Sequence, residues 1–149
     1  MFTFILEYKI IRINAQQHLV NTTILPVDCD KPSTYFYIMK RVSILPLYDA
    51  TLTSIDSSHQ ILSRVNDFMK YQGKPPFYKV EIVGLEKETT LNGGLYNIHV
   101  DKTIDQVTKT DVIILPLLCG DFSKAILKNR KYNDWIIAQY HDNAEIVCL

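Results

Sequence analysis

The stretch DVIILPLL, Asp111 to Leu118, decides the fold of this chain. After Asp111 every residue is apolar, and no polar residue alternates with the others. A continuous apolar run of this length is typical of a strand buried on both faces, in the interior of a parallel sheet. The stretch therefore predicts an α/β protein with a mostly parallel central sheet.

Apolar runs and helical patterns alternate around this strand from Met39 onward. The first helix should carry Thr53 as N-cap, with Asp56 three residues later. Asn92-Gly93-Gly94 predicts a turn between antiparallel segments. The expected strands are Arg41–Leu45, Phe77–Leu85, 111–118 and Ala144–Leu149, and the segment Leu91–Val100 should form a small hairpin or a bent strand. An amphipathic helix is expected at Thr53–Gln72, with Ile61, Leu62, Val65, Phe68 and Met69 at helical spacing.

A broken helical region is expected between the last two strands. Asp121 or Ser123 should open its first piece, and a break is expected near Asn129 to Tyr132. Asn133 should cap a second piece that places Trp135, Ile136 and Tyr140 on its inner side. The order of elements favours an α/β fold with helices packed against a mostly parallel sheet.

Composition excludes several classes of protein. Lys plus Arg and Asp plus Glu are 16 each, so the zero net charge provides no basic field for nucleic acid or an anionic membrane. The cysteines Cys29, Cys119 and Cys148 are odd in number and lack CxxC spacing, which argues against a disulfide framework and a metal site. Charged residues interrupt the apolar N-terminus, and no run could span a membrane. We expect a cytoplasmic protein with no cofactor and no membrane partner.

Two cysteines are candidates for chemistry. Cys148 lies in the apolar run AEIVCL, so a buried structural thiol is the favoured interpretation and a nucleophile the weaker one. Cys119 directly precedes Gly120 at the carboxyl end of a predicted strand, where open α/β sheets hold their ligands. A packed loop residue remains the more frequent role for such a cysteine, because no base stands near it in the sequence.

A ligand pocket, if one exists, should lie over the carboxyl ends of the strands. Asp49 and Asp56 flank the first strand-to-helix connection on that side, although Asp56 is more often the kind of residue that starts a helix. The residues expected to line the pocket are Pro46, Tyr48, Asp49, Asp56, Cys119, Gly120 and Asp121. No catalytic residue and no metal ligand is predicted.

With these elements placed, three stretches resemble the ThiJ/PfpI superfamily, whose fold is like that of class I glutamine amidotransferases. They are residues 39–85, which begin MKRVSILPLYDATL, then TDVIILPLLCGDF from Thr110, and NDWIIAQYHDNAEIVCL from Asn133. The version at the N-terminus of AraC-type transcription regulators is the most similar. The resemblance covers 39–149 and implies a flavodoxin-like three-layer sandwich that is incomplete at its C-terminal end. It leaves 1–38 as an unmatched extension, either native or read through from an early start codon.

The resemblance also carries three departures from the enzymes of the superfamily. Cys148 falls two positions before the expected nucleophile elbow, so the nucleophile position is not in this sequence. Ser57 to Gln60 stand where those enzymes hold a glutamate, and Leu117 and Leu118 replace the glycines expected beside an oxyanion hole. The resemblance therefore implies a non-catalytic ligand-sensing or dimerisation domain with a small-molecule effector, a homodimer in the full-length protein, and DNA contact only through an additional helix-turn-helix domain.

Two alternatives remain open. One is part of a cysteine-dependent hydrolase, amidase or hydratase of the same superfamily, with its nucleophile elbow beyond Leu149. The other is a stand-alone interaction module, for which we expect a monodisperse protein with a cooperative melt.

Overall fold

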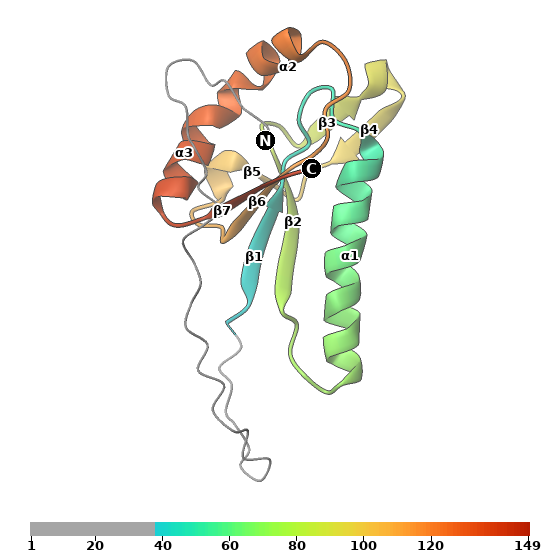
Figure 1. Cartoon of the computed structure of the whole chain (residues 1–149), viewed down its shortest axis with the longest axis vertical. Helices are drawn as coiled ribbons and strands as arrows, with labels where there is room; N and C mark the ends of the chain where they lie inside the picture. Colours follow the sequence, from blue (N-terminus) through green and yellow to red (C-terminus); the bar gives the residue numbers. More distant parts are fainter. Residues whose placement is uncertain (1–37) are drawn as a thin grey trace. The chain divides into compact units, whose positions relative to one another are not determined.

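The computed structural model describes residues 38–149, which lie within one compact unit of the chain. Five parallel strands form its central sheet in the order β5-β2-β1-β6-β7 (Figure 1). The predicted α/β class with a parallel sheet is confirmed. Residues 1–37 lie outside the described residues. They include Cys29 and all of the predicted extension except Ile38. The strands are β1 (Lys40–Ile44), β2 (Tyr78–Gly84), β5 (Lys102–Thr103), β6 (Val112–Leu115) and β7 (Glu145–Cys148).

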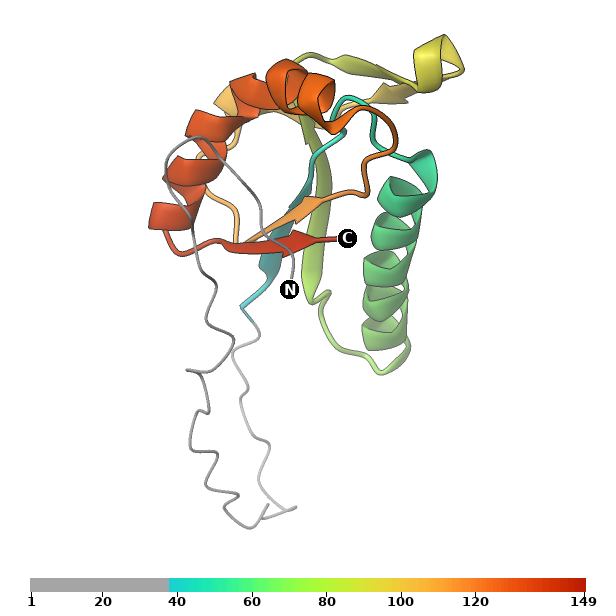
Figure 2. The same cartoon turned by 45° about the horizontal axis from the view of Figure 1, so that its top comes forward.

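Helices cover the two faces of this sheet unequally. The chain moves from β1 through α1 (Leu52–Tyr71) to β2, and in the opposite direction from β6 through α2 (Phe122–Asn129) and α3 (Asn133–His141) to β7. Right-handed crossovers in opposite directions place their helices on opposite faces. Figure 2 shows α1 on one side of the sheet and α2 with α3 on the other. The core therefore lies on both faces of β1 and β6, where Ile44 and Ile113 are fully buried.

The N-cap of α1 lies two residues before the predicted one. Its N-cap is Thr51, which makes no side-chain capping bond, so the prediction of Thr53 as the cap is wrong. The Thr51 N–H donates to the Leu117 carbonyl oxygen, and the tertiary contact rather than a capping box sets the start. At the other end Asn66 joins α1 to β2, because its side chain accepts from the N–H groups of Phe77 and Tyr78 and donates to the Tyr78 carbonyl.

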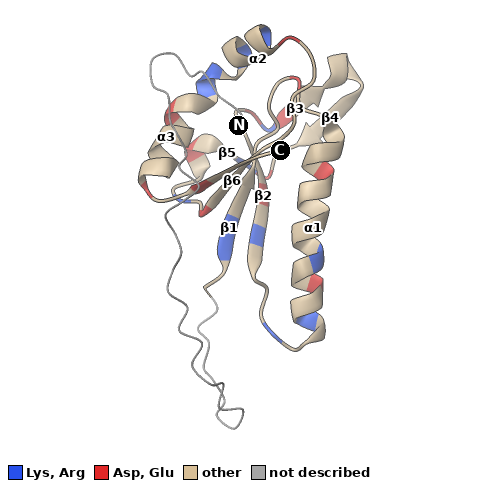
Figure 3. Ribbon diagram, in the orientation of Figure 1, with Lys and Arg blue, Asp and Glu red and all other residues tan. Residues whose placement is uncertain are grey.

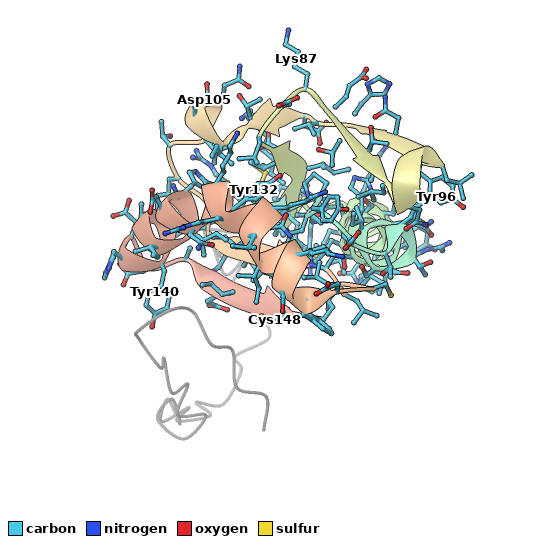
Figure 4. The ribbon with its side chains drawn as sticks, turned by 90° about the horizontal axis from the view of Figure 1, so that it is seen from above. Lys87, Tyr96, Asp105, Tyr132, Tyr140 and Cys148 are labelled. Carbon is cyan, nitrogen blue, oxygen red and sulfur yellow. The ribbon has the colours of Figure 1, made fainter. Side chains whose placement is uncertain are left out.

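The predicted break between α2 and α3 is present as a 3-10 turn, η3 (Arg130–Tyr132). Because this turn runs directly into α3, the N-cap of α3 is Tyr132, and the prediction that Asn133 caps this helix is wrong. Trp135 and Ile136 pack against the core as expected. Tyr140 does not, since it is 48% exposed and points outward, whereas Tyr132 lies inside (Figure 4). The buried residue of α3 itself is Gln139.

The Gln139 side chain belongs to a polar network beneath α3. Its amide oxygen accepts from the Thr110 N–H at 2.9 Å, and its amide nitrogen donates to the Thr108 carbonyl. The Ser43 hydroxyl of β1 donates to the Thr110 hydroxyl at 3.0 Å. The network therefore connects α3 to β1 and to the segment that leads into β6, and it satisfies the polar groups that the helix buries.

The predicted antiparallel excursion is confirmed as the hairpin of β3 (Glu88–Leu91) and β4 (Tyr96–His99), joined by the 3-10 turn η1 (Asn92–Gly94). Its first strand begins before the predicted Leu91. Leu91 and Ile98 are buried and anchor the hairpin to the core. The sequence analysis missed the two-residue strand β5 and the 3-10 turn η2 (Ile104–Gln106), which are too short to leave a pattern.

The expectation that Cys148 is a buried core thiol is wrong. Cys148 is exposed, because β7 is the outer strand of the described sheet and pairs only with β6 there. Partial desolvation still raises the pKa of this thiol, which disfavours the thiolate. Cys119 and Cys148 are both free cysteines.

Charges of both signs are interspersed over the surface of this unit (Figure 3). Within residues 38–149, no helix is long and apolar enough to cross a membrane.

Candidate functional site

A cavity of about 310 Å³ lies where the chain leaves β1. Tyr48 and Asp49 form one side of it, and the tip of the β3–β4 hairpin forms the other through Thr90, Asn92, Gly93 and Gly94. This is the carboxyl end of the parallel sheet, where α/β proteins hold their ligands. Its volume is at the lower end of the range for small-molecule pockets.

Two residues of α2 hold Tyr48 in place. The Asn129 side chain accepts from the Tyr48 N–H at 2.7 Å and donates to its carbonyl at 3.1 Å, as a paired strand would. The Lys128 ammonium lies 3.8 Å from the centroid of the Tyr48 ring, within range of a cation–π interaction. Because backbone and ring are both held, Tyr48 offers a preformed wall to a ligand.

Asp49 is positioned by a second loop. It has a left-handed φ of 64°, and its carbonyl accepts from the Cys119 N–H at 2.8 Å. An isolated bridge between Ala50 and Leu118 continues this contact. Gly120 has a φ of 122°, and a Cβ atom there would lie 3.3 Å from a carboxylate oxygen of Asp49. The backbone conformation therefore favours a glycine, and any side chain here would push the Asp49 carboxylate away by a few tenths of an ångström.

The residues predicted for the pocket are only partly gathered there. Tyr48 and Asp49 line it, while Cys119 and Gly120 contact Asp49 from behind. Asp121 caps α2 by accepting from the N–H groups of Ser123 and Lys124, so its role is structural. Two others lie elsewhere: Pro46 is buried, and Asp56 is exposed on α1, where it accepts from Gln60.

The hairpin side of the cavity and the two residues behind Tyr48 are not predicted from the sequence. Asn92-Gly93-Gly94 predicts a turn and nothing more. The left-handed φ angles of Asn92, Gly93 and Gly94 let this turn expose its backbone to the cavity. The sequence contains no signal that this turn would face Asp49, since the two segments are far apart along the chain.

The site holds no assembled nucleophile. Cys119 is exposed, and within residues 38–149 its thiol has no hydrogen bond or ion pair with a histidine or carboxylate. General-base activation of a cysteine requires such a partner within hydrogen-bond distance. The described residues also contain no group of three His, Cys, Asp or Glu side chains that could hold a metal ion. The arrangement can bind a small polar molecule.

A second cavity, of about 380 Å³, lies at the base of the same hairpin. Its lining combines Lys87, His99 and Lys102 with Glu88 and Asp101. Most of these charges are already paired: Glu88 contacts His99 at 3.2 Å, and Lys102 contacts Glu81 at 3.1 Å. Lys79 also contacts Glu81, and although desolvation opposes them, the two lysines hold the pKa of Glu81 below its usual value.

Comparison with known proteins identifies the fold. No family model matches the chain, and no curated protein does. A solved structure described as a "putative transcriptional regulator protein" from Vibrio parahaemolyticus is 20% identical, with a TM-score of 0.60. A DJ-1 superfamily protein from Agrobacterium tumefaciens is 16% identical over 74% of this chain and 53% of its own, with a TM-score of 0.48.

The Vibrio parahaemolyticus structure is matched over 74% of this chain and 56% of its own length. This chain therefore spans little more than half of that protein. At this level of identity the likeness shows the fold alone, and the flavodoxin-like α/β fold expected from the ThiJ/PfpI resemblance is confirmed.

Proposed function

We propose that this chain is a ligand-sensing domain of an AraC-type transcription regulator, which binds a small effector without chemistry. DNA contact in such a protein is assigned to a helix-turn-helix domain outside this sequence. The observation that carries the proposal is the cavity between Tyr48, Asp49 and the hairpin turn, which is lined by a carboxylate, a hydroxyl and an amide and in which residues 38–149 assemble no activated nucleophile.

The chemistry of the cavity indicates a ligand that donates hydrogen bonds. Asp49 is the charged residue of its lining, and no ion pair neutralises it within residues 38–149. Thr90 and Asn92 add hydroxyl and amide groups that accept and donate. A ligand bearing an amine or several hydroxyl groups would satisfy the carboxylate and these side chains together.

The hairpin provides a route from binding to a signal. Leu91 and Ile98 seat it on the core, and its turn touches the ligand cavity. A ligand that bridges Asp49 and Asn92 would fix the hairpin against the loop after β1. A ligand shifts a sensor between two conformations only if it binds one of them more tightly. The bridge between Asp49 and Asn92 would be a contact that the ligand makes in only one position of the hairpin. The likeness to the Vibrio parahaemolyticus protein, which is described as a "putative transcriptional regulator protein", also supports a regulatory role.

A hydrolase of the same superfamily is the second proposal, and the exposure of Cys119 at the carboxyl end of the sheet favours it. It requires a base beside that thiol, or a nucleophile supplied outside this sequence. The two proposals differ in whether a compound that binds is also altered or attached to sulfur.

A thermal-shift screen of amines, amino acids and polyols tests the sensing proposal. A compound that raises the melting temperature of the wild type should lose its effect on Asp49→Asn and keep it on Asp56→Asn, because only Asp49 lines the cavity. Mass spectrometry of the mixture should recover the compound unchanged and the protein unmodified. Turnover of the compound, or an adduct on Cys119 that Cys119→Ser abolishes, would favour the hydrolase instead.

A further inference from the structure

The second cavity, at the base of the β3–β4 hairpin, has one side that is fixed to β2. The Asp101 N–H donates to the Ile82 carbonyl at 2.9 Å, and the Asp101 carboxylate accepts from the Ile82 N–H at 2.7 Å. Val100 packs so closely on Gly84 that a Cβ atom at the glycine would lie 2.8 Å from a valine methyl. Backbone bonds and packing therefore hold this side of the cavity against the sheet.

The carboxylate and amide oxygens of the cavity lining are already in use. Glu88 accepts from the Asn97 amide at 2.7 Å with one oxygen, and its other oxygen lies 3.2 Å from Nδ1 of His99. The side-chain oxygen of Gln106 accepts from the Thr103 N–H at 3.0 Å. A ligand that offers only N–H or O–H groups would compete with these bonds for its partners.

The donors of the same lining are left over. Lys87 makes no ion pair within residues 38–149, and Figure 4 shows its side chain extending away from the body of the domain. The Lys102 ammonium lies 3.1 Å from Glu81, a contact that uses one of its three N–H groups. The amide nitrogen of Gln106 has no hydrogen bond in the described part of the chain. The cavity therefore has more free donors than free acceptors.

His99 adds a donor to this set when its ring is protonated. Because Nδ1 faces Glu88, we assign the proton of the neutral ring to Nδ1, which leaves Nε2 without one. Protonation puts an N–H on Nε2, and the side chain is 85% exposed, so this group is accessible to a ligand. The charged groups that share the lining with this ring are Lys87, Glu88, Asp101 and Lys102.

We propose that the second cavity binds a small oxyanion, such as the carboxylate or phosphate group of a metabolite. An oxyanion supplies the acceptor atoms and the negative charge that the free ammonium, imidazolium and amide N–H groups require. The volume of about 380 Å³ is within the range of small-molecule pockets, so a larger molecule can carry the anionic group. The inference does not rest on the proposed sensing function, because Asp49 lines a different cavity.

Amide chemical-shift titrations of the full chain with sulfate and, separately, with succinate test the proposal. Sulfate has the tetrahedral shape of a phosphate group and succinate carries carboxylates, so the tighter binder shows which oxyanion the cavity prefers. We expect saturable shifts on Val100, Lys102 and Gln106. Sodium chloride at matched ionic strength should cause no saturable shift there. Shifts that chloride reproduces, or saturable shifts elsewhere and not at this cavity, would overturn the proposal.

Matched substitutions separate the cavity from general surface charge. Lys87→Gln should weaken sulfate binding at least about fivefold, because it removes a charged donor. Lys74→Gln removes an exposed lysine in the loop before β2, at the other end of that strand, and should leave the affinity unchanged. Circular dichroism should show that both variants keep the wild-type fold. Equal losses from the two substitutions would overturn the proposal.

The pH dependence of sulfate binding tests the part assigned to His99. Sulfate keeps its charge between about pH 5.5 and about pH 8, the range in which histidine side chains change theirs. Binding to the wild type should strengthen toward the lower pH, and His99→Gln should abolish that increase. An increase that persists in His99→Gln, or a wild-type affinity that does not change with pH, would overturn the assignment of this donor.

Discussion

Alkaline pH should destabilise this domain through Tyr132. The side chain is 3% exposed, and burial raises its pKa to about 12, against which a hydrogen bond with the backbone of Leu85 acts weakly. The unfolded chain releases this proton near pH 10 and the folded one only near pH 12. Stability is therefore complete below pH 10 and falls as the pH rises toward 12.

The expected loss follows from the shift. Two pKa units correspond to about 2.7 kcal/mol at full effect, of which about 2 kcal/mol is lost by pH 11.5. Urea unfolding followed by circular dichroism between pH 8 and 11.5 would measure it for the wild type and for Tyr132→Phe. The phenylalanine variant keeps the ring but cannot ionise, so the stability difference between the two proteins should change by about 2 kcal/mol over this range. A difference that stays constant with pH would refute the reasoning.

Three substitutions test the packing that positions the site by urea unfolding, two of them against an exposed neighbour and the third against a second substitution that relieves its clash. Gln139→Leu should lower the free energy of unfolding by about 1–3 kcal/mol, because the Thr110 N–H is left buried without its acceptor. The exposed control Ile137→Ala should change it by less than about 1 kcal/mol, and equal losses would contradict the polar network. Asn66→Ala should lower the free energy of unfolding by about 2–4 kcal/mol through three lost hydrogen bonds, and Asp67→Ala should change it very little. A small loss for Asn66→Ala would show that α1 does not depend on this link to β2. Gly84→Ala should cost about 1–3 kcal/mol, since its Cβ would lie 2.8 Å from a methyl of Val100; adding Val100→Ala should recover part of the loss, and no recovery would exclude the clash.

The central strand and the helices around it could be predicted because their signals are local. The uninterrupted apolar run at Asp111 to Leu118 predicts an interior strand. The structure agrees, because β6 lies between β1 and β7. The boundary of α1 was less predictable. The helix begins after Thr51 because the Thr51 N–H donates a hydrogen bond to the carbonyl of Leu117, in a loop far away along the chain. No pattern in the sequence near Thr51 predicts that contact.

Burial was harder to predict than secondary structure. Val147 and Cys148 belong to an apolar run, and the same run would be buried in an interior strand and is exposed in an outer one. Sequence periodicity reports which residues share a face, but it does not report whether another element covers that face. The same reason explains why Ile61 and Phe68 fit the helical pattern of α1 and are still exposed.

The candidate site was predictable on one side only. Tyr48 and Asp49 follow from the rule that ligands lie at the carboxyl ends of parallel strands. Thr90 and Asn92 reach the same cavity through the placement of the hairpin, which depends on the burial of Leu91 and Ile98. Asp121 has the position of a site residue and the role of a helix cap.

An amide chemical-shift titration tests the central proposal most directly. Isotope-labelled protein would be mixed with a compound that the thermal screen selects, and the shifts would be mapped onto residues 38–149. We predict that the largest shifts fall on Tyr48, Asp49, Asn92, Gly93 and Gly94, and that they reverse when the compound is dialysed away. Shifts centred on Lys87, Val100 and Lys102 at the other cavity, or an irreversible change at Cys119, would contradict the account.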